Sequence, residues 1–191
     1  MNYYDKNAQE FFESTVNADM TPHQNEFIQL LPENACILDA GCGSGRDSKM
    51  FKSLGFNVTA IDGSAEMCKL ATEYSGINVK QMQFQDLNYE NCFDGIWASA
   101  SLLHVPSSEI EDVISRLKTS LKVEGILYAS FKYGEFEGER NGRYFNDFNE
   151  NTSKKLFEKL DFEIIRIWIT FDGRKGREDE KWVNLLVKKN Y

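Results

Sequence analysis

The feature that most constrains the fold of this chain is an apolar run that ends in an acid and leads into a glycine-rich loop. Residues 35–39 form the run, which closes on Asp39, and residues 45–54 can form a helix after the loop. The loop carries glycines at alternate positions, namely Gly41, Gly43 and Gly45. A strand, a glycine loop and a helix in this order build nucleotide sites in open α/β sheets, because glycine lets the backbone turn tightly and approach a ligand closely.

Two further acids follow the next two predicted strands. The run 57–61 ends in Asp62, and the run 78–84 leads to Asp86. Because the carboxyl ends of parallel strands lie at one edge of a sheet, we expect both acids beside the glycine loop. Asp62 can then accept hydrogen bonds from the two hydroxyls of a ribose, and Asp86 one from the amine of an adenine. An acid at a strand end is also a common helix cap, so a glycine turn that binds nothing stays open as an alternative.

These segments resemble the motifs of the class I S-adenosylmethionine-dependent methyltransferases. The resemblance rests on four segments in a fixed order, residues 38–45, 58–64, 85–87 and 93–99, and it extends over residues 35–132. It implies an α/β fold: a Rossmann-like, seven-stranded, mostly parallel sheet with helices on both faces and a C-terminal antiparallel hairpin. Residues 43–48 and 55–60 also bear a thinner similarity to the small tellurite-resistance-type methyltransferases.

The periodicity of the chain fits that architecture. Strands are expected at 35–39, 57–61, 78–84, 93–98 and 126–131, and a final hairpin at 162–170 and 181–188. Helices are expected at 5–17, from Thr21 to Pro32, and at 45–54, 64–74, 107–121 and 152–160. We expect one methyltransferase domain over residues 1–191, with residues 1–31 as a helical lid and residues 35–191 as the cofactor-binding core.

The resemblance implies S-adenosylmethionine as cofactor, with S-adenosylhomocysteine as product. The residues predicted to bind it are Asp39, Gly41, Cys42, Gly43, Gly45, Asp62, Gly63, Ser64, Met67, Gln85, Asp86, Leu87 and Ser99. Cys42 fits a small side chain tucked under the loop better than a nucleophile. Met67 lies at a helical spacing that equally suits a core residue.

Methyl transfer from a sulfonium needs positioning and the exclusion of water more than a strong catalytic group. His104, just past the fourth predicted strand, is the candidate general base, although it could instead hydrogen-bond the turn at Pro106. The predicted substrate-binding residues are Tyr4, Tyr133, Arg143 and Arg174. Arginines that converge on a site favour a carboxylate or another oxyanion.

Composition narrows the class of partner. The formal net charge of −8 disfavours binding of long nucleic acids, which usually need a basic surface. No apolar run reaches the length of a membrane span, and the start lacks the features of a signal peptide, so a cytoplasmic protein is expected. The four cysteines form no zinc pattern, so no metal is expected. The predicted partner is a small-molecule substrate, and the chain is expected to be a monomer or homodimer.

Three alternatives remain at this point. The chain could be a catalytically idle S-adenosylmethionine-binding subunit or sensor, or it could methylate a macromolecule together with a partner. A nicotinamide enzyme is the third, but the dinucleotide motif places its third glycine where Arg46 stands, one residue after Gly45.

Overall fold

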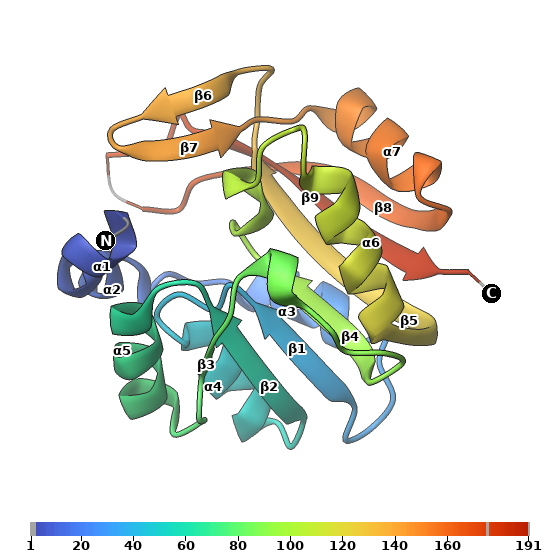
Figure 1. The fold of residues 1–191 in the computed structure, drawn as a ribbon, viewed down its shortest axis with the longest axis horizontal. Helices are drawn as coiled ribbons and strands as arrows, with labels where there is room; N and C mark the ends of the chain where they lie inside the picture. The colour runs from blue at the N-terminus through green and yellow to red at the C-terminus, as the bar shows by residue number, and fades with distance from the viewer. Residues whose placement is uncertain (1–2, 175, 191) are drawn as a thin grey trace.

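A seven-stranded sheet forms the centre of the molecule (Figure 1). The computed structural model describes residues 3–174 and 176–190. The strand order is β3-β2-β1-β4-β5-β9-β8. The strands are β1 (Cys36–Ala40), β2 (Asn57–Asp62), β3 (Lys80–Gln81), β4 (Phe93–Ala98), β5 (Leu121–Lys132), β8 (Phe162–Phe171) and β9 (Lys181–Lys189). β1 to β5 run parallel to one another, and β9 runs antiparallel between β5 and β8. The predicted fold and its C-terminal hairpin are confirmed.

Two strands differ in length from the prediction. β3 is only two residues long, because the chain turns into a 3₁₀ helix, η1 (Phe84–Asp86), soon after it has paired with the end of β2. β5 begins at Leu121 rather than at residue 126, since Leu121 pairs with Phe93 before an irregularity in the register. The alternation of apolar residues marks the regular part of a strand and gives no signal for these two ends.

Helices cover both faces of the sheet. One face carries α3 (Thr21–Ile28), α4 (Arg46–Ser53) and α5 (Ala65–Ser75), and the other carries α6 (Ile110–Ser120) and α7 (Glu150–Lys159). On the first face, Phe27 and Phe51 pack against Trp97 of β4, with ring centroids 5.3 and 5.4 Å from the indole. Burial on both faces explains why the central strands read as nearly continuous apolar runs.

The predicted N-terminal lid divides into two parts. α3 packs as a core helix, because its Phe27 has no exposed surface. The helices before it, α1 (Tyr3–Lys6) and α2 (Ala8–Thr15), lie outside the sheet and next to α5. The hairpin of β6 (Glu137–Arg140) and β7 (Arg143–Asn146) projects at the same end (Figure 1). We call residues 3–15 the N-terminal segment. α3 begins at Thr21, with Met20 as its N-cap and Pro22 in its first turn.

The charged loop after β5 holds a second, two-stranded sheet that the sequence analysis did not predict. β6 (Glu137–Arg140) and β7 (Arg143–Asn146) pair antiparallel, with Arg140 opposite Arg143. Between them Asn141 and Gly142 have φ of 50° and 75°. Positive φ at both central residues is the type I′ turn that Asn-Gly favours in hairpins, so the signal was present in the sequence.

Candidate functional site

The glycine loop between β1 and α4 is closely packed on two sides. Gly41 has φ of 79°, and a Cβ added to it would lie 2.5 Å from the Cβ of Ser101. Gly45 has φ of 75°, and its Cβ would lie 3.0 Å from the carbonyl oxygen of Ala71 on α5. No larger residue fits either position without displacing its neighbours. The predicted tight turn is therefore present.

Two acids flank the loop. Asp62, at the end of β2, accepts hydrogen bonds from the backbone N–H of Gly43 and of Ser64, both at 2.9 Å. Burial raises the pKa of Asp62, and these two bonds act against that rise. Asp39 is buried and accepts a hydrogen bond from Ser48 Oγ at 2.6 Å. Burial, and then the nearby Asp47, raise the pKa of Asp39. A cationic or hydroxyl-rich ligand between the two acids would be favourable.

The N-terminal segment lies directly over this loop. The ring of Phe11 lies 3.4 Å from where a Cβ of Gly43 would stand. Asp5 accepts a hydrogen bond from Ser64 Oγ at 2.6 Å, and the carbonyl of Thr15 accepts one from Arg46 Nη1 at 3.1 Å. Residues 3–15 therefore reach the glycine loop, the start of α5 and the start of α4.

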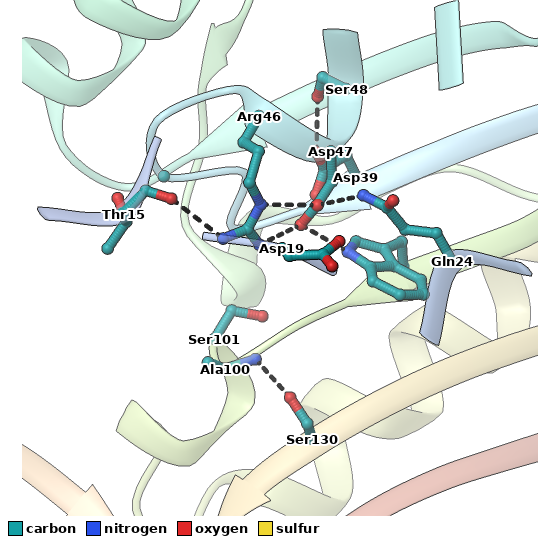
Figure 2. Close-up of polar contacts among 12 residues, drawn as sticks. Thr15, Asp19, Gln24, Asp39, Arg46, Asp47, Ser48, Ala100, Ser101 and Ser130 are labelled. Carbon is teal, nitrogen blue, oxygen red and sulfur yellow. Dashed lines mark hydrogen bonds and ion pairs between the residues drawn. The ribbon is translucent and has the colours of Figure 1, made fainter. Parts of the chain in front are cut away.

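The buried carboxylate of Asp47, which was not predicted from the sequence, links α4 with α3 and β4. Asp47 accepts hydrogen bonds from Gln24 Nε2 at 2.7 Å, from Arg46 Nε at 2.9 Å and from Trp97 Nε1 at 2.9 Å (Figure 2). Gln24 comes from α3 and Trp97 from β4, so Asp47 connects two helices with the sheet. The local sequence pattern does not predict this role, since an acid in the first turn of a helix, such as Asp47, is common.

The predicted adenine-binding segment is only partly oriented toward the loop. Leu87 is buried, whereas Asp86 is exposed and Gln85 donates a hydrogen bond to Glu109 on the surface. Two neighbours that were not predicted lie closer to the glycines. Phe84 Cζ is 3.3 Å from the position of a Gly41 Cβ, and Gln83 Nε2 donates to the Gly63 carbonyl at 3.2 Å. The expected acid is present, but its neighbours Gln83 and Phe84 make the contacts with the loop.

Three other predicted cofactor residues have structural contacts. Ser64 is the N-cap of α5 and accepts a hydrogen bond from the Met67 N–H at 3.2 Å. The Met67 side chain is 1% exposed, so it presents no surface to an adenine in this conformation. Cys42 is buried among Ala60, Ala71 and other apolar side chains, and burial raises the pKa of its thiol. That environment suits packing and disfavours a thiolate nucleophile.

The chain leaves β4 at the same edge of the sheet. Ser99 is half-buried directly after β4, and Ala100 donates its N–H to Ser130 Oγ at 2.8 Å. Ser101 Oγ donates to the Ala40 carbonyl at 2.7 Å, which ties this turn to the end of β1 (Figure 2 shows Ser101 with the Ala100–Ser130 contact). A 3₁₀ helix, η2 (Leu102–His104), follows and places His104 beside the N-terminal segment.

Both ring nitrogens of His104 are engaged. Its Nδ1 lies 2.6 Å from the carbonyl oxygen of Tyr144, so Nδ1 carries the hydrogen and donates it. Nε2 then accepts a hydrogen bond from the hydroxyl of Tyr4, also at 2.6 Å. Burial, and to a smaller extent the charge of Arg143, lower the pKa of His104 to about 4. The alternative contact with the turn at Pro106 is not what holds the ring.

Of the four predicted substrate residues, Tyr4 and Arg143 lie together, whereas Tyr133 and Arg174 lie apart from them. Arg143 lies against the Tyr3 ring, and its charge acts on the Tyr4 hydroxyl. Tyr133 is instead exposed, with Lys181 over its ring. The fold explains this separation: β6 and β7 carry Arg143 away from Tyr133, which remains at the end of β5 and pairs with Phe148.

Arg174 is held apart from that group by its own carboxylate. It forms an ion pair with the buried Asp172, at 2.6 Å, within the loop between β8 and β9. The prediction that a hairpin arginine joins Arg143 at substrate has no supporting contact here. In the described part of the chain, no cluster of three or more His, Cys, Asp or Glu side chains is arranged to hold a metal ion. Within the same residues, no helix has the length and apolar character needed to span a membrane.

Comparisons with known proteins agree on the family. A family model described as a methyltransferase domain matches residues 37–125. An uncharacterized methyltransferase of Staphylococcus carnosus (strain TM300) is 32% identical over 189 residues, which is 94% of this chain and 89% of that protein. A ubiquinone biosynthesis O-methyltransferase of Xanthomonas axonopodis pv. citri (strain 306) is 33% identical over 120 residues, which is 58% of this chain and 49% of that protein.

A solved structure shows the same fold over nearly the whole chain. It is the 1,6-didemethyltoxoflavin-N1-methyltransferase of Burkholderia thailandensis with bound 1,6-didemethyltoxoflavin and S-adenosylhomocysteine, at a TM-score of 0.78 and 21% identity, covering 98% of this chain and 84% of that one. The chain belongs to the class I S-adenosylmethionine-dependent methyltransferases.

Proposed function

We propose that this enzyme methylates a small-molecule acceptor. The observation that carries the proposal is the closure of the loop edge by the N-terminal segment, where Tyr4 contacts His104 and Phe11 lies over Gly43. A small acceptor can be enclosed under such a cover, whereas a polymer would need an open groove. Two relatives support the proposal by name, one from ubiquinone biosynthesis and one that binds 1,6-didemethyltoxoflavin.

The residues at the loop edge suit S-adenosylmethionine. Gly41 and Gly43 leave the loop backbone without side chains, and Asp39 and Asp62 offer carboxylates on either side. We propose that Asp62 binds the ribose hydroxyls and that Asp39 lies toward the ammonium of the methionine part. Bound there, the cofactor supplies an electrophilic methyl group on a sulfonium. Because its positive charge stabilises nearby carboxylates, the raised pKa values of both acids should fall when it binds.

We propose that His104 orients the acceptor rather than acting as its general base. Its low pKa makes it a weak proton acceptor near neutral pH. Its Nδ1–H is held by Tyr144, so Nε2 keeps a lone pair that faces the Tyr4 hydroxyl. The Tyr4 oxygen in turn accepts a hydrogen bond from Arg143, and its remaining lone pair can accept one from an acceptor hydroxyl or amine. The chain then contributes positioning and the exclusion of water.

Calorimetric titration with S-adenosylmethionine and S-adenosylhomocysteine tests the cofactor assignment. Wild type should bind both at micromolar Kd, and Asp62→Ala should weaken binding by about tenfold or more, the loss expected for hydrogen bonds to a charged group. Asp112→Ala is the matched control, since it also removes a carboxylate but from the exposed face of α6. Equal binding by wild type and Asp62→Ala would contradict the assignment. Tight binding without methyl transfer to any of a broad set of small acceptors would favour the idle-subunit alternative.

A further inference from the structure

Arg143 differs from the other arginines of this chain in its lack of an ion pair within the described residues. The sequence contains seven arginines. Six of them form an ion pair with a carboxylate: Arg46, Arg116, Arg140, Arg166, Arg174 and Arg177. Within residues 3–174 and 176–190, Arg143 forms no such pair.

The surroundings of Arg143 hold its guanidinium in place without neutralising it. The group lies against two aromatic rings, 5.1 Å from the centroid of Tyr3 and 5.0 Å from that of Phe145. Its Nε is buried and has no hydrogen-bond partner in the described part of the chain. A buried N–H of a charged group that lacks an acceptor is unfavourable, so an added oxygen acceptor would stabilise it.

Among the described residues, a second buried polar atom has no hydrogen-bond partner, but it belongs to a side chain whose charge is already paired. It is Oδ1 of Asp147, and the same carboxylate is already ion-paired with Arg140 through Oδ2. Arg140 and Arg143 stand opposite each other in the β6–β7 hairpin. One arginine of this pair is therefore matched inside the protein, and the other is left with its charge uncompensated.

Arg143 is close to the groups that line the acceptor side. Its charge acts on both Tyr4 and His104, which are hydrogen-bonded to each other. The Tyr4 ring also packs against Phe11 at 5.0 Å, and Phe11 covers Gly43 of the loop. Arg143 lies over the Tyr3 ring, and the rings of Tyr3, Tyr4 and Phe11 contact one another in turn, so this row of rings connects Arg143 with the cofactor loop. His104 is neutral near pH 7, so Arg143 is the positive charge of this group.

We infer that Arg143 binds a carboxylate of the methyl acceptor, so that the acceptor is a small carboxylic acid. This inference rests on the proposed function and adds the substrate class to it. The planar guanidinium fork matches the two oxygens of a carboxylate, and the flanking rings fix the plane in which it is presented. A protein with net charge −8 repels anions in general, so a site for one needs such a local cation.

Matched pairs of ligands test the inference. The probes are small aromatic carboxylic acids and their primary amides, for example benzoate with benzamide and 4-hydroxybenzoate with 4-hydroxybenzamide. Each pair is titrated by calorimetry into the protein saturated with S-adenosylhomocysteine. The variants are Arg143→Gln and, as a charge-matched control, Arg166→Gln, whose arginine pairs with Glu26 on the surface.

For at least one pair, wild type and Arg166→Gln should bind the acid about tenfold or more tightly than its amide, the size of one charge-assisted hydrogen bond. Arg143→Gln should lose that preference while keeping its affinity for S-adenosylhomocysteine. If Arg143→Gln does not fold, Arg143→Lys takes its place, and the preference should shrink because the fork is lost.

Two results overturn the inference while the cofactor still binds. One is that no acid binds more tightly than its amide, up to about millimolar concentration. The other is a preference for acids that survives in the Arg143 variant. Failure of wild type to bind S-adenosylhomocysteine would instead refute the proposed function, so the two failures are told apart within one experiment.

Discussion

Loss of the Asp47 carboxylate should lower the free energy of unfolding and weaken cofactor binding. Asp47→Asn keeps the shape of the side chain but removes its charge. The change deprives Arg46 of its ion pair, at 2.8 Å, and disturbs the bonds from Gln24 and Trp97. The exposed fractions of the two paired side chains are 20% for Arg46 and 7% for Asp47, so solvent screens the interaction poorly.

The expected loss follows from that burial. Breaking a buried ion pair by removing one partner destabilises a protein by about 3–5 kcal/mol. For a domain of this size, each kcal/mol shifts Tm by about 2–4 °C, which gives a fall of roughly 6–20 °C. The same change at the exposed pair of α6, Asp112→Asn, should cost less than about 1 kcal/mol.

Urea unfolding followed by tryptophan fluorescence measures both variants, and differential scanning calorimetry gives Tm. Because Gln24 and Arg46 link α3 and the Thr15 carbonyl to the loop, Asp47→Asn should also weaken binding of S-adenosylhomocysteine. If Asp47→Asn unfolds within about 1 kcal/mol of wild type, the assigned role of this carboxylate is refuted.

Two further predictions concern the loop and the histidine. Gly41→Ala should abolish measurable S-adenosylmethionine binding, because it adds a contact of 2.5 Å to the strain of a positive φ. Gly55→Ala, with φ of 90° but an added Cβ that would lie 3.9 Å from Asn34 Oδ1, should bind normally, and equal affinities of the two variants in a titration would contradict this. His104 has an ordinary pKa of 6.5 and a folded pKa of about 4, so between these values the unfolded state binds a proton that the folded state does not. The free energy of unfolding should therefore decrease as the pH is lowered through that window, by up to about 1.4 kcal/mol per pH unit, and His104→Gln should reduce this slope. Urea midpoints at several pH values measure the slope, and one that His104→Gln leaves unchanged would contradict the reasoning.

The cofactor side of the site could be predicted from sequence because its signals are local. The apolar run before Asp39, the alternating glycines and the acid after the second strand each lie within a few residues of one another. Parallel pairing of β1 and β2 then brings Asp39 and Asp62 to one edge without further information. The Asn-Gly turn of the β6–β7 hairpin is an equally local signal, but the charged segments on either side of it lack the apolar alternation that predicts strands.

The acceptor side could not be predicted in the same way. Tyr4 and His104 are 100 positions apart, and Gln24 and Asp47 are 23 apart. Such contacts depend on how helices pack outside the sheet, which no pattern of hydrophobic residues encodes. Arginines were predicted at the substrate from their residue type and from their place in the loop after the fifth strand and in the final hairpin, but whether an arginine is available depends on its neighbours. Asp172 pairs with Arg174, whereas Arg143 forms no ion pair within the described ranges.

The β6–β7 hairpin forms a sheet of its own, separate from the seven-stranded one. Its strands are four residues each, and they share no backbone pairing with the strands that carry the cofactor loop. A change of side chain in this hairpin can therefore alter what meets Tyr4 and His104 while the central sheet keeps its register. Selection for a new acceptor could act on this short insertion alone, and the methyl-donating half of the enzyme would be inherited unchanged.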